Sequence, residues 1–120
     1  MNKSSSGFTL IELLIVCAVI GILAAVFVPS LAGARQKTLD TAALAYTRQC
    51  VNSLEASRDY QGFIKDIKSC EDPLLGDGAL KGVPSVKQTV VVVNQTEYTI
   101  QTTSATGKVV RYEKGLFTSS

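Results

Sequence analysis

The chain contains no histidine and no tryptophan. Histidine is the commonest general base and metal ligand in proteins, so its absence removes the usual partner that would activate a serine or threonine hydroxyl. No glycine-rich phosphate motif follows an expected strand, and the acidic residues lack the spacing of a calcium loop. The sequence therefore predicts no enzyme activity, no catalytic residue, no metal site and no cofactor.

A strong excess of one charge is also missing. The 120 residues include 12 Lys and Arg against 10 Asp and Glu, which gives a net charge of +2. Removal of Lys3 with a leader would lower the 12 basic residues to 11. A nearly neutral chain has no field strong enough to attract nucleic acid or anionic lipid, so direct nucleic-acid binding is not indicated.

Charge is absent altogether from one long stretch of the chain. Leu13 to Val28 has neither a charge nor a side-chain amide, and the uncharged stretch continues to Ala34. As a helix rising 1.5 Å per residue, it is long enough to cross a hydrocarbon core of about 30 Å. Glu12 directly precedes the run, where an unpaired carboxylate would cost on the order of 2–3 kcal/mol. A charge at this position needs a partner.

The string GFTLIELLIV at residues 7–16, which follows a short polar leader, closely resembles the N-terminus of type IV pilins and pseudopilins. The resemblance implies that a prepilin peptidase cuts after Gly7 and methylates the new amino group of Phe8. It also implies that Glu12 pairs with the Phe8 ammonium of a neighbouring subunit during assembly. Such pairing is physically reasonable, because a freed amino terminus is a cation that every neighbour brings to that depth.

An ordinary secretory signal peptide is the alternative interpretation of the same region. Ala32-Gly33-Ala34 matches the small-x-small pattern of a signal-peptidase site, and a cut after Ala34 would release a small secreted binding module. The length of the apolar run, the Glu12 charge and the Gly7-Phe8 pair ahead of it favour the pilin-type cut.

Two residues weaken the apolar helix. Gly21 lowers helix propensity by about 1 kcal/mol relative to alanine, and Pro29 removes a backbone hydrogen bond. In pilins the matching segment is often unwound within the filament, and the resemblance implies the same here; a simple kink is the alternative. Cys17, in the middle of the run, is interpreted as a small apolar side chain.

Beyond Pro29 the pattern predicts a continued, amphipathic helix that ends near Arg58. Apolar residues recur every three or four positions, as on one face of an α-helix. They are Leu39, Ala43, Tyr46, Cys50 and Leu54. A helix of about 50 residues is roughly 75 Å long, so it is expected to extend beyond a small globular part.

Residues 59–84 have the composition of a loop, within which residues 63–67 are expected to form one helical turn. The acidic residues at 71, 72 and 77 are interpreted as solvated. If this part of the chain reaches an oxidising compartment, Cys50 and Cys70 are expected to form a disulfide. Closing a loop of about twenty residues would contribute on the order of 3 kcal/mol. Two free thiols are the alternative.

Three strands are predicted, at residues 86–93, 97–103 and 108–113, followed by an irregular tail over 115–120. Turn-forming residues separate the strands, which favours an antiparallel sheet. Alternation places Tyr98, Ile100 and Thr102 on one face of the second strand, and Val110 with Tyr112 on one face of the third.

Val90 to Val93 is apolar on both faces of the first strand. A sheet that rests on one helix is covered on one side only, so the second side needs another source of cover. Residues 74–84 with their leucines, or a neighbouring subunit, are the two candidates.

The fold class predicted is α+β: a long N-terminal helix, membrane-spanning in its first half, packed on a small antiparallel sheet of three or four strands. The chain divides into a leader at 1–7, a transmembrane or filament-core helix at 8–34, an amphipathic helix at 35–58, a loop region at 59–84, and a sheet with a tail at 85–120.

The resemblance implies a structural subunit of a bacterial type IV pilus, which its N-terminal helix assembles into an extracellular filament for twitching motility, adhesion or DNA uptake. A pseudopilin of a type II secretion or competence system is the alternative. The major secretion pseudopilins carry a calcium-binding carboxylate cluster near the C-terminus, where this chain offers only Glu113.

The partners implied are other copies of the chain and other pilins, the prepilin peptidase, the inner-membrane assembly platform with its ATPase, and an outer-membrane secretin if the envelope has one. The precursor would reside in the inner membrane, and the assembled subunit in a filament on the cell surface.

Overall fold

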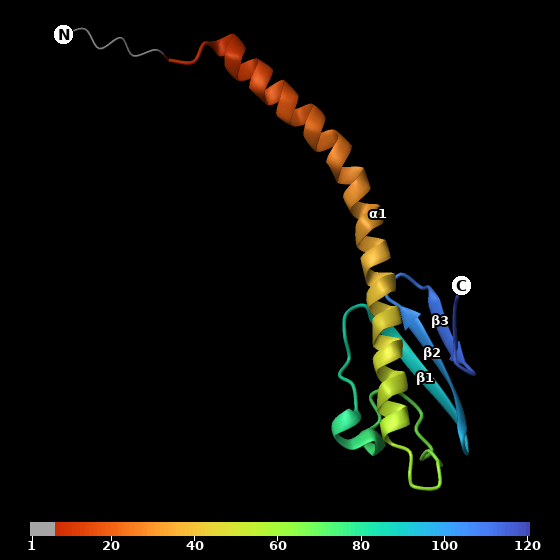
Figure 1. The fold of residues 1–120 in the computed structure, drawn as a ribbon. Coiled ribbons are helices and arrows are strands. Elements are labelled where there is room, and N and C mark those ends of the chain that lie inside the picture. The colour runs from red at the N-terminus through yellow and green to blue at the C-terminus, as the bar shows by residue number, and fades with distance from the viewer. Residues whose placement is uncertain (1–6) are drawn as a thin grey trace, which may run out of the picture. The chain divides into compact units, whose positions relative to one another are not determined.

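The computed structural model describes residues 7–120, so the expected leader, except for Gly7, lies outside the described residues. Within this part of the chain, one long helix precedes a short 3₁₀ helix and four strands. The chain divides into two compact units, Met1–Arg35 and Gln36–Ser120, and we call the second unit the head. Figure 1 shows the sheet of the head beside the helix. The predicted α+β fold is confirmed.

Helix α1 runs from Leu10 to Ala56 and contains 47 residues. In the head it buries one stripe of side chains whose positions follow the period of 3.6 residues. The buried members are Ala43, Tyr46, Thr47, Cys50 and Leu54. The amphipathic pattern expected from the sequence is therefore confirmed from Ala43 onward, with Leu39 half-buried at its start.

The four strands form one antiparallel sheet in chain order. They are β1 (Val86–Asn94), β2 (Glu97–Ser104), β3 (Val109–Glu113) and β4 (Leu116–Ser119). Side chains alternate between the two faces, so Tyr98, Ile100 and Thr102 of β2 are buried together. On β3, Val110 is buried and Tyr112 half-buried. The inward-facing positions expected for both strands are confirmed.

The core of the head joins the α1 stripe to this inner face and to the loop between them. Its buried residues are Tyr46, Cys50, Leu54, Ile64, Ile67, Cys70, Leu75, Val91, Tyr98 and Ile100. Beside them the hydroxyl of Thr47 donates to that of Thr102 at 2.8 Å, fully buried. Because this bond satisfies both hydroxyls, it joins α1 to β2 without leaving a buried polar group unpaired.

The prediction of an irregular tail over residues 115–120 is wrong, since the chain forms β4 there. Lys114 and Gly115 have φ values of 50° and 82°, and such a left-handed pair turns the chain back in a two-residue hairpin. The Phe117 ring then packs on Tyr112, with ring centres 4.8 Å apart. The sequence signal was weak because the strand is only four residues long.

The prediction of a helical turn at residues 63–67 is also wrong. The Ile64 N–H donates to the Gln95 carbonyl at 3.0 Å, and the Val91 N–H donates to the Lys68 carbonyl at 2.8 Å. These bonds hold the segment along the outer edge of β1. The backbone groups of that edge are therefore partly paired, which protects it from pairing with another chain.

The short helix forms further along the loop, as η1 at Pro73–Gly78. Asp72 caps it, because its carboxylate accepts the Leu74 N–H at 3.0 Å and the Lys68 N–H at 3.1 Å. The same two bonds, that from Leu74 first, hold the pKa of Asp72 below its usual value. Proline at the first helical position suits this start because its missing N–H would be unpaired there in any case.

Only one face of β1 is covered within the head. Val91 is 4% exposed, whereas Val92 is 62% exposed. Leu75 and Leu80 pack into the core that Val91 faces. The sequence left two candidates for covering the second face of β1. The prediction that residues 74–84 cover it is therefore wrong.

Candidate assembly site

The predicted cleavage site lies outside the helix. Gly7 and Phe8 are exposed, and α1 begins two residues later, at Leu10. A peptide bond outside a helix can take the extended form that a protease binds, without first breaking helical hydrogen bonds. The geometry is thus compatible with a cut between Gly7 and Phe8, while the cut and the methylation themselves stay predictions.

Thr9 and Glu12 together start the helix. The Thr9 N–H donates to Glu12 Oε2 at 2.9 Å, and the Glu12 N–H donates to Thr9 Oγ1 at 3.3 Å. Two such reciprocal bonds make a capping box, which satisfies N–H groups that have no partner at a helix start. Thr9 was not among the residues expected from the sequence to have a role, although a threonine three residues before a glutamate is the signal for this motif.

Glu12 therefore has a local bond in addition to its expected pairing between subunits. Its carboxylate faces the backbone N–H of Thr9, one residue from the amino group that the expected cut would free on Phe8. A carboxylate has two oxygens and room for several donors. An ammonium group from a second copy would share Glu12 with the capping bond or displace it.

Helix α1 continues through both of the residues expected to weaken it. Pro29 has no N–H, so the Ala25 carbonyl lacks its usual helical donor. The Ser30 hydroxyl donates to the Phe27 carbonyl at 2.9 Å in the same turn. At Gly21 a Cβ atom would meet nothing within 4 Å, so no close contact within the described chain requires glycine there. Its expected role in weakening the helix stays a prediction.

The first part of α1 presents an apolar surface. Each large apolar side chain from Leu10 to Leu31 is at least 49% exposed. The helix contains a segment long and apolar enough to cross a membrane, and none of that segment is buried. Cys17 lies on it as an exposed free thiol. A continuous apolar surface of this kind needs lipid or another protein chain to cover it.

Cys50 and Cys70 form a disulfide, with the two sulfurs 2.08 Å apart. It joins α1 to the loop that precedes η1, and both residues are fully buried. The Cys70 N–H also donates to the Thr89 hydroxyl at 3.2 Å. The loop is therefore attached to the helix on one side and to β1 on the other.

Asp40 of α1 binds the turn between β2 and β3. Its carboxylate accepts hydrogen bonds from the hydroxyls of Thr106 and Ser104, the latter at 2.9 Å. Lys108 Nζ lies 3.8 Å from the same carboxylate. These donors, Thr106 first, hold the pKa of Asp40 below its usual value. No local sequence pattern predicts this cluster, because Ser104 is 64 positions from Asp40.

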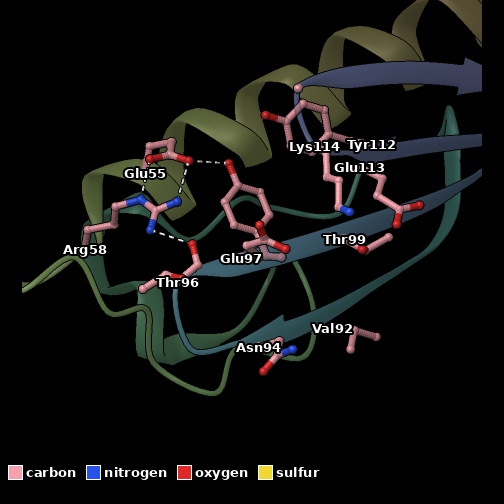
Figure 2. A pocket seen from close by; sticks show the side chains of 12 residues that line it. Glu55, Arg58, Val92, Asn94, Thr96, Glu97, Thr99, Tyr112, Glu113 and Lys114 are labelled. Atoms are coloured by element: carbon pink, nitrogen blue, oxygen red, sulfur yellow. Dashed lines mark hydrogen bonds and ion pairs between the residues drawn. The ribbon is translucent and has the colours of Figure 1, made fainter.

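A second polar cluster lies near the C-terminal end of α1 (Figure 2). The Arg58 guanidinium donates to Glu55 Oε1 at 3.0 Å and to the Thr96 carbonyl at 2.8 Å. The Tyr98 hydroxyl donates to the same Glu55 oxygen at 2.7 Å. The bond from Arg58, followed by that from Tyr98, lowers the pKa of Glu55. Together these bonds attach the end of α1 to β2 and to the turn before it.

These residues form one side of a hollow of about 690 Å³ on the head. Figure 2 shows other polar groups around it, which include Asn94, Glu97, Thr99, Glu113 and Lys114. Within residues 7–120, no group of three or more Cys, Asp or Glu side chains is placed to hold a metal ion. The bonded polar groups of the hollow serve to fasten the helix to the sheet.

The comparisons with known proteins agree with this geometry. A family profile described as a prokaryotic N-terminal methylation motif matches residues 2–28. Another, described as Pilin A4, matches residues 39–117, which is more than half of the chain. No solved structure matches.

A curated relative from Thermus thermophilus is named type IV wide pilus major component PilA4. It is 51% identical over 53 residues, which are 44% of this chain and 40% of the relative. The aligned part thus spans less than half of the relative's length. Because the Pilin A4 profile covers most of the head and the methylation motif covers the start of α1, the chain belongs to the type IV pilin family, whose members are structural subunits and not enzymes.

Proposed function

We propose that this pilin is held in the inner membrane as a precursor and is then assembled through α1 into an extracellular type IV pilus. The exposed apolar surface between Leu10 and Leu31 carries this proposal. Before assembly, lipid would cover that surface; in the filament, the same surface would pack against the helices of other copies. Burial of apolar area is the dominant favourable contribution to such an association.

In this proposal Glu12 sets the register between subunits by pairing with the Phe8 ammonium of a neighbour. The balanced charge of the chain does not support DNA binding by the subunit itself. The filament would serve motility, adhesion or DNA uptake through its whole surface and its associated proteins. By analogy with the Thermus relative, we propose that the chain is a main component of its filament.

The proposed partners are the prepilin peptidase, the inner-membrane platform with its ATPase and, where an outer membrane exists, a secretin. The support for the peptidase is the methylation motif at residues 2–28 together with an exposed Gly7-Phe8 bond.

Two measurements test the proposal. Deletion of the gene is expected to remove the filaments seen by negative-stain microscopy, and intact mass of the sheared protein is expected to show a start at methylated Phe8. A start at Arg35 would instead identify the secreted module. Unchanged filaments after deletion, combined with a secretion or competence defect, would favour the pseudopilin alternative.

A further inference from the structure

The stretch between the expected leader and α1 is not helical. Gly7, Phe8 and Thr9 lie outside the helix, which begins at Leu10. Glycine is a poor helix former, whereas phenylalanine and threonine are tolerated within helices. Composition by itself therefore does not keep Phe8 and Thr9 out of α1, and a local interaction has to fix where the helix starts.

The hydrogen bonds of Thr9 and Glu12 fix that start by competing with growth of the helix. The Leu13 N–H donates to the Thr9 carbonyl at 3.2 Å, which is the first bond of the helical type. One residue earlier, the Glu12 N–H donates to the Thr9 hydroxyl at 3.3 Å, whereas in a longer helix it would donate to the Phe8 carbonyl. The helix α1 therefore cannot grow over Phe8 until the bond to the Thr9 hydroxyl is broken.

A longer helix would include the bond that the peptidase is expected to cut. Ser6 is the nearest upstream residue of a type that caps helices, and a helix capped by Ser6 would begin at Gly7. The Gly7–Phe8 bond would then lie in its first turn. Because a helical segment has to open locally before a protease can bind it in extended form, the rate of the cut would fall.

We propose that Thr9 is a positioning residue for removal of the leader, because its hydroxyl holds the start of α1 at Leu10 and keeps the Gly7–Phe8 bond out of the helix. The proposal rests on the proposed function, since it requires a cut after Gly7; the methylation-motif match at residues 2–28 supports that cut independently. The cut is a hydrolysis, in which water gives its hydroxyl to the Gly7 carbonyl carbon and a proton to the Phe8 nitrogen as the C–N bond breaks.

Gly7 and Glu12 support the same arrangement in lesser ways. A Cβ atom at Gly7 would meet nothing within 4 Å, so within the described chain glycine contributes its low helix propensity and not a close contact. The Glu12 side chain supplies the second bond of the cap, from the Thr9 N–H at 2.9 Å. Glu12→Ala leaves the Thr9 hydroxyl in place, so removal of the leader does not require the Glu12 carboxylate.

Removal of the hydroxyl tests this role, with pulse–chase of the full precursor in cells as the measurement. Thr9→Ala removes the cap and introduces the best helix former, so it is expected to slow removal of the leader by about two- to fivefold. Thr9→Ser keeps a capping hydroxyl and is expected to be cut at the wild-type rate. Thr41→Ala is the matched control, because the Thr41 hydroxyl donates to the Lys37 carbonyl at 2.8 Å inside α1, and it is expected to leave the rate unchanged.

A second variant separates this conformational role from direct recognition of the hydroxyl by the peptidase. Proline suits the first helical position and keeps the residue before it out of the helix. Leu10→Pro combined with Thr9→Ala therefore fixes the helix start without a hydroxyl and is expected to restore the rate, with Leu10→Pro alone as its control. With detergent-solubilised precursor and purified peptidase, Thr9→Ala is expected to raise KM at unchanged kcat, because a smaller fraction of the precursor has the bond outside the helix.

Membrane fractionation verifies that every variant is inserted. A wild-type rate from Thr9→Ala would overturn the proposal. A slow double variant beside a normal Leu10→Pro single variant would overturn it too, since the peptidase would then be binding the hydroxyl itself. If Leu10→Pro alone slows the cut, the KM comparison decides, and a fall in kcat at unchanged KM contradicts the proposal. A wild-type mature protein that does not begin at Phe8 would instead refute the proposed function.

Discussion

At the residue scale, Glu12 has two candidate roles, because it makes a capping bond within the chain and is expected to pair with the Phe8 ammonium of another subunit. Glutamine can replace glutamate in a capping box, so Glu12→Gln keeps the helix start but removes the charge. Glu12→Ala removes both the capping bond and the charge. The two substitutions therefore separate the role of Glu12 within the chain from its role between chains.

Glu12→Ala and Glu12→Gln are both expected to leave the leader cut intact and to lower filament yield by about tenfold or more, since charge pairing at this depth is worth more than one factor of ten. Immunoblotting for the processed form and recovery of sheared filaments provide the measurements. If Glu12→Gln assembles like the wild type, pairing with the Phe8 ammonium is the wrong mechanism, and the capping bond accounts for the glutamate.

Because of Asp40, the stability of the head is expected to fall at acid pH. Its folded pKa lies below the usual value of 3.8, so the stability it contributes is present above that pH and is lost as the pH falls through the folded pKa. Asp40→Asn is expected to lower the Tm by a few degrees at pH 7 and to show a smaller fall in Tm between pH 5 and pH 3 than the wild type. Equal pH dependence of the two proteins would show that Asp40 makes no such contribution.

At the scale of elements, β1 shows how one residue step decides between core and surface. Val91 and Val92 are both valines in one strand, yet only Val91 faces α1. Val91→Lys places an ammonium group in the apolar core and is expected to unfold the head. Val92→Lys is expected to leave the fold intact. Circular dichroism of the chain in detergent distinguishes the two, and folded protein from both would contradict the register.

The disulfide is the other device that acts between elements, because it joins α1 to the loop. Removal of both cysteines by Cys50→Ala and Cys70→Ala is expected to cost on the order of 3 kcal/mol of unfolding free energy. Chemical denaturation measures that loss. Thiol labelling of the non-reduced, denatured wild type should find Cys17 alone, and three labelled cysteines would contradict the disulfide.

At the scale of the whole molecule, the chain consists of an apolar segment that needs external cover and a head that has a core of its own. A chain that lacks residues 1–34 is expected to be a soluble monomer with the disulfide formed, because the core cluster lies wholly within the head. The full chain is expected in the membrane fraction. Size-exclusion chromatography and membrane fractionation test both statements, and an aggregated or unfolded truncated chain would refute the first.

Much of this arrangement could be predicted from local patterns in the sequence. The stripe from Ala43 to Leu54 and the alternation of Tyr98, Ile100 and Thr102 each report a backbone period together with the side that is buried, whereas the uncharged run reports a segment that is apolar on every side. These patterns depend only on neighbours within a few residues, and each agrees with the structure. Thr9 was missed although its motif is equally local.

Other features depend on contacts between distant residues, and these only the tertiary structure decided. β4 is held in place because the Phe117 ring packs against Tyr112 and Arg48. The residues of the turn at Lys114 do not by themselves predict these two contacts. Asp40 meets Ser104 because the sheet packs at one particular height along α1.

The sequence by itself determined that this chain has a pilin-like start, one long helix and a small antiparallel sheet, since each follows from periodicity, composition or a short motif. The tertiary structure decided that residues 74–84 leave the outer face of β1 uncovered and that Leu74 is exposed while Leu75 is buried. The physical reason is that a local pattern specifies which side of an element is apolar, whereas packing decides what lies against that side.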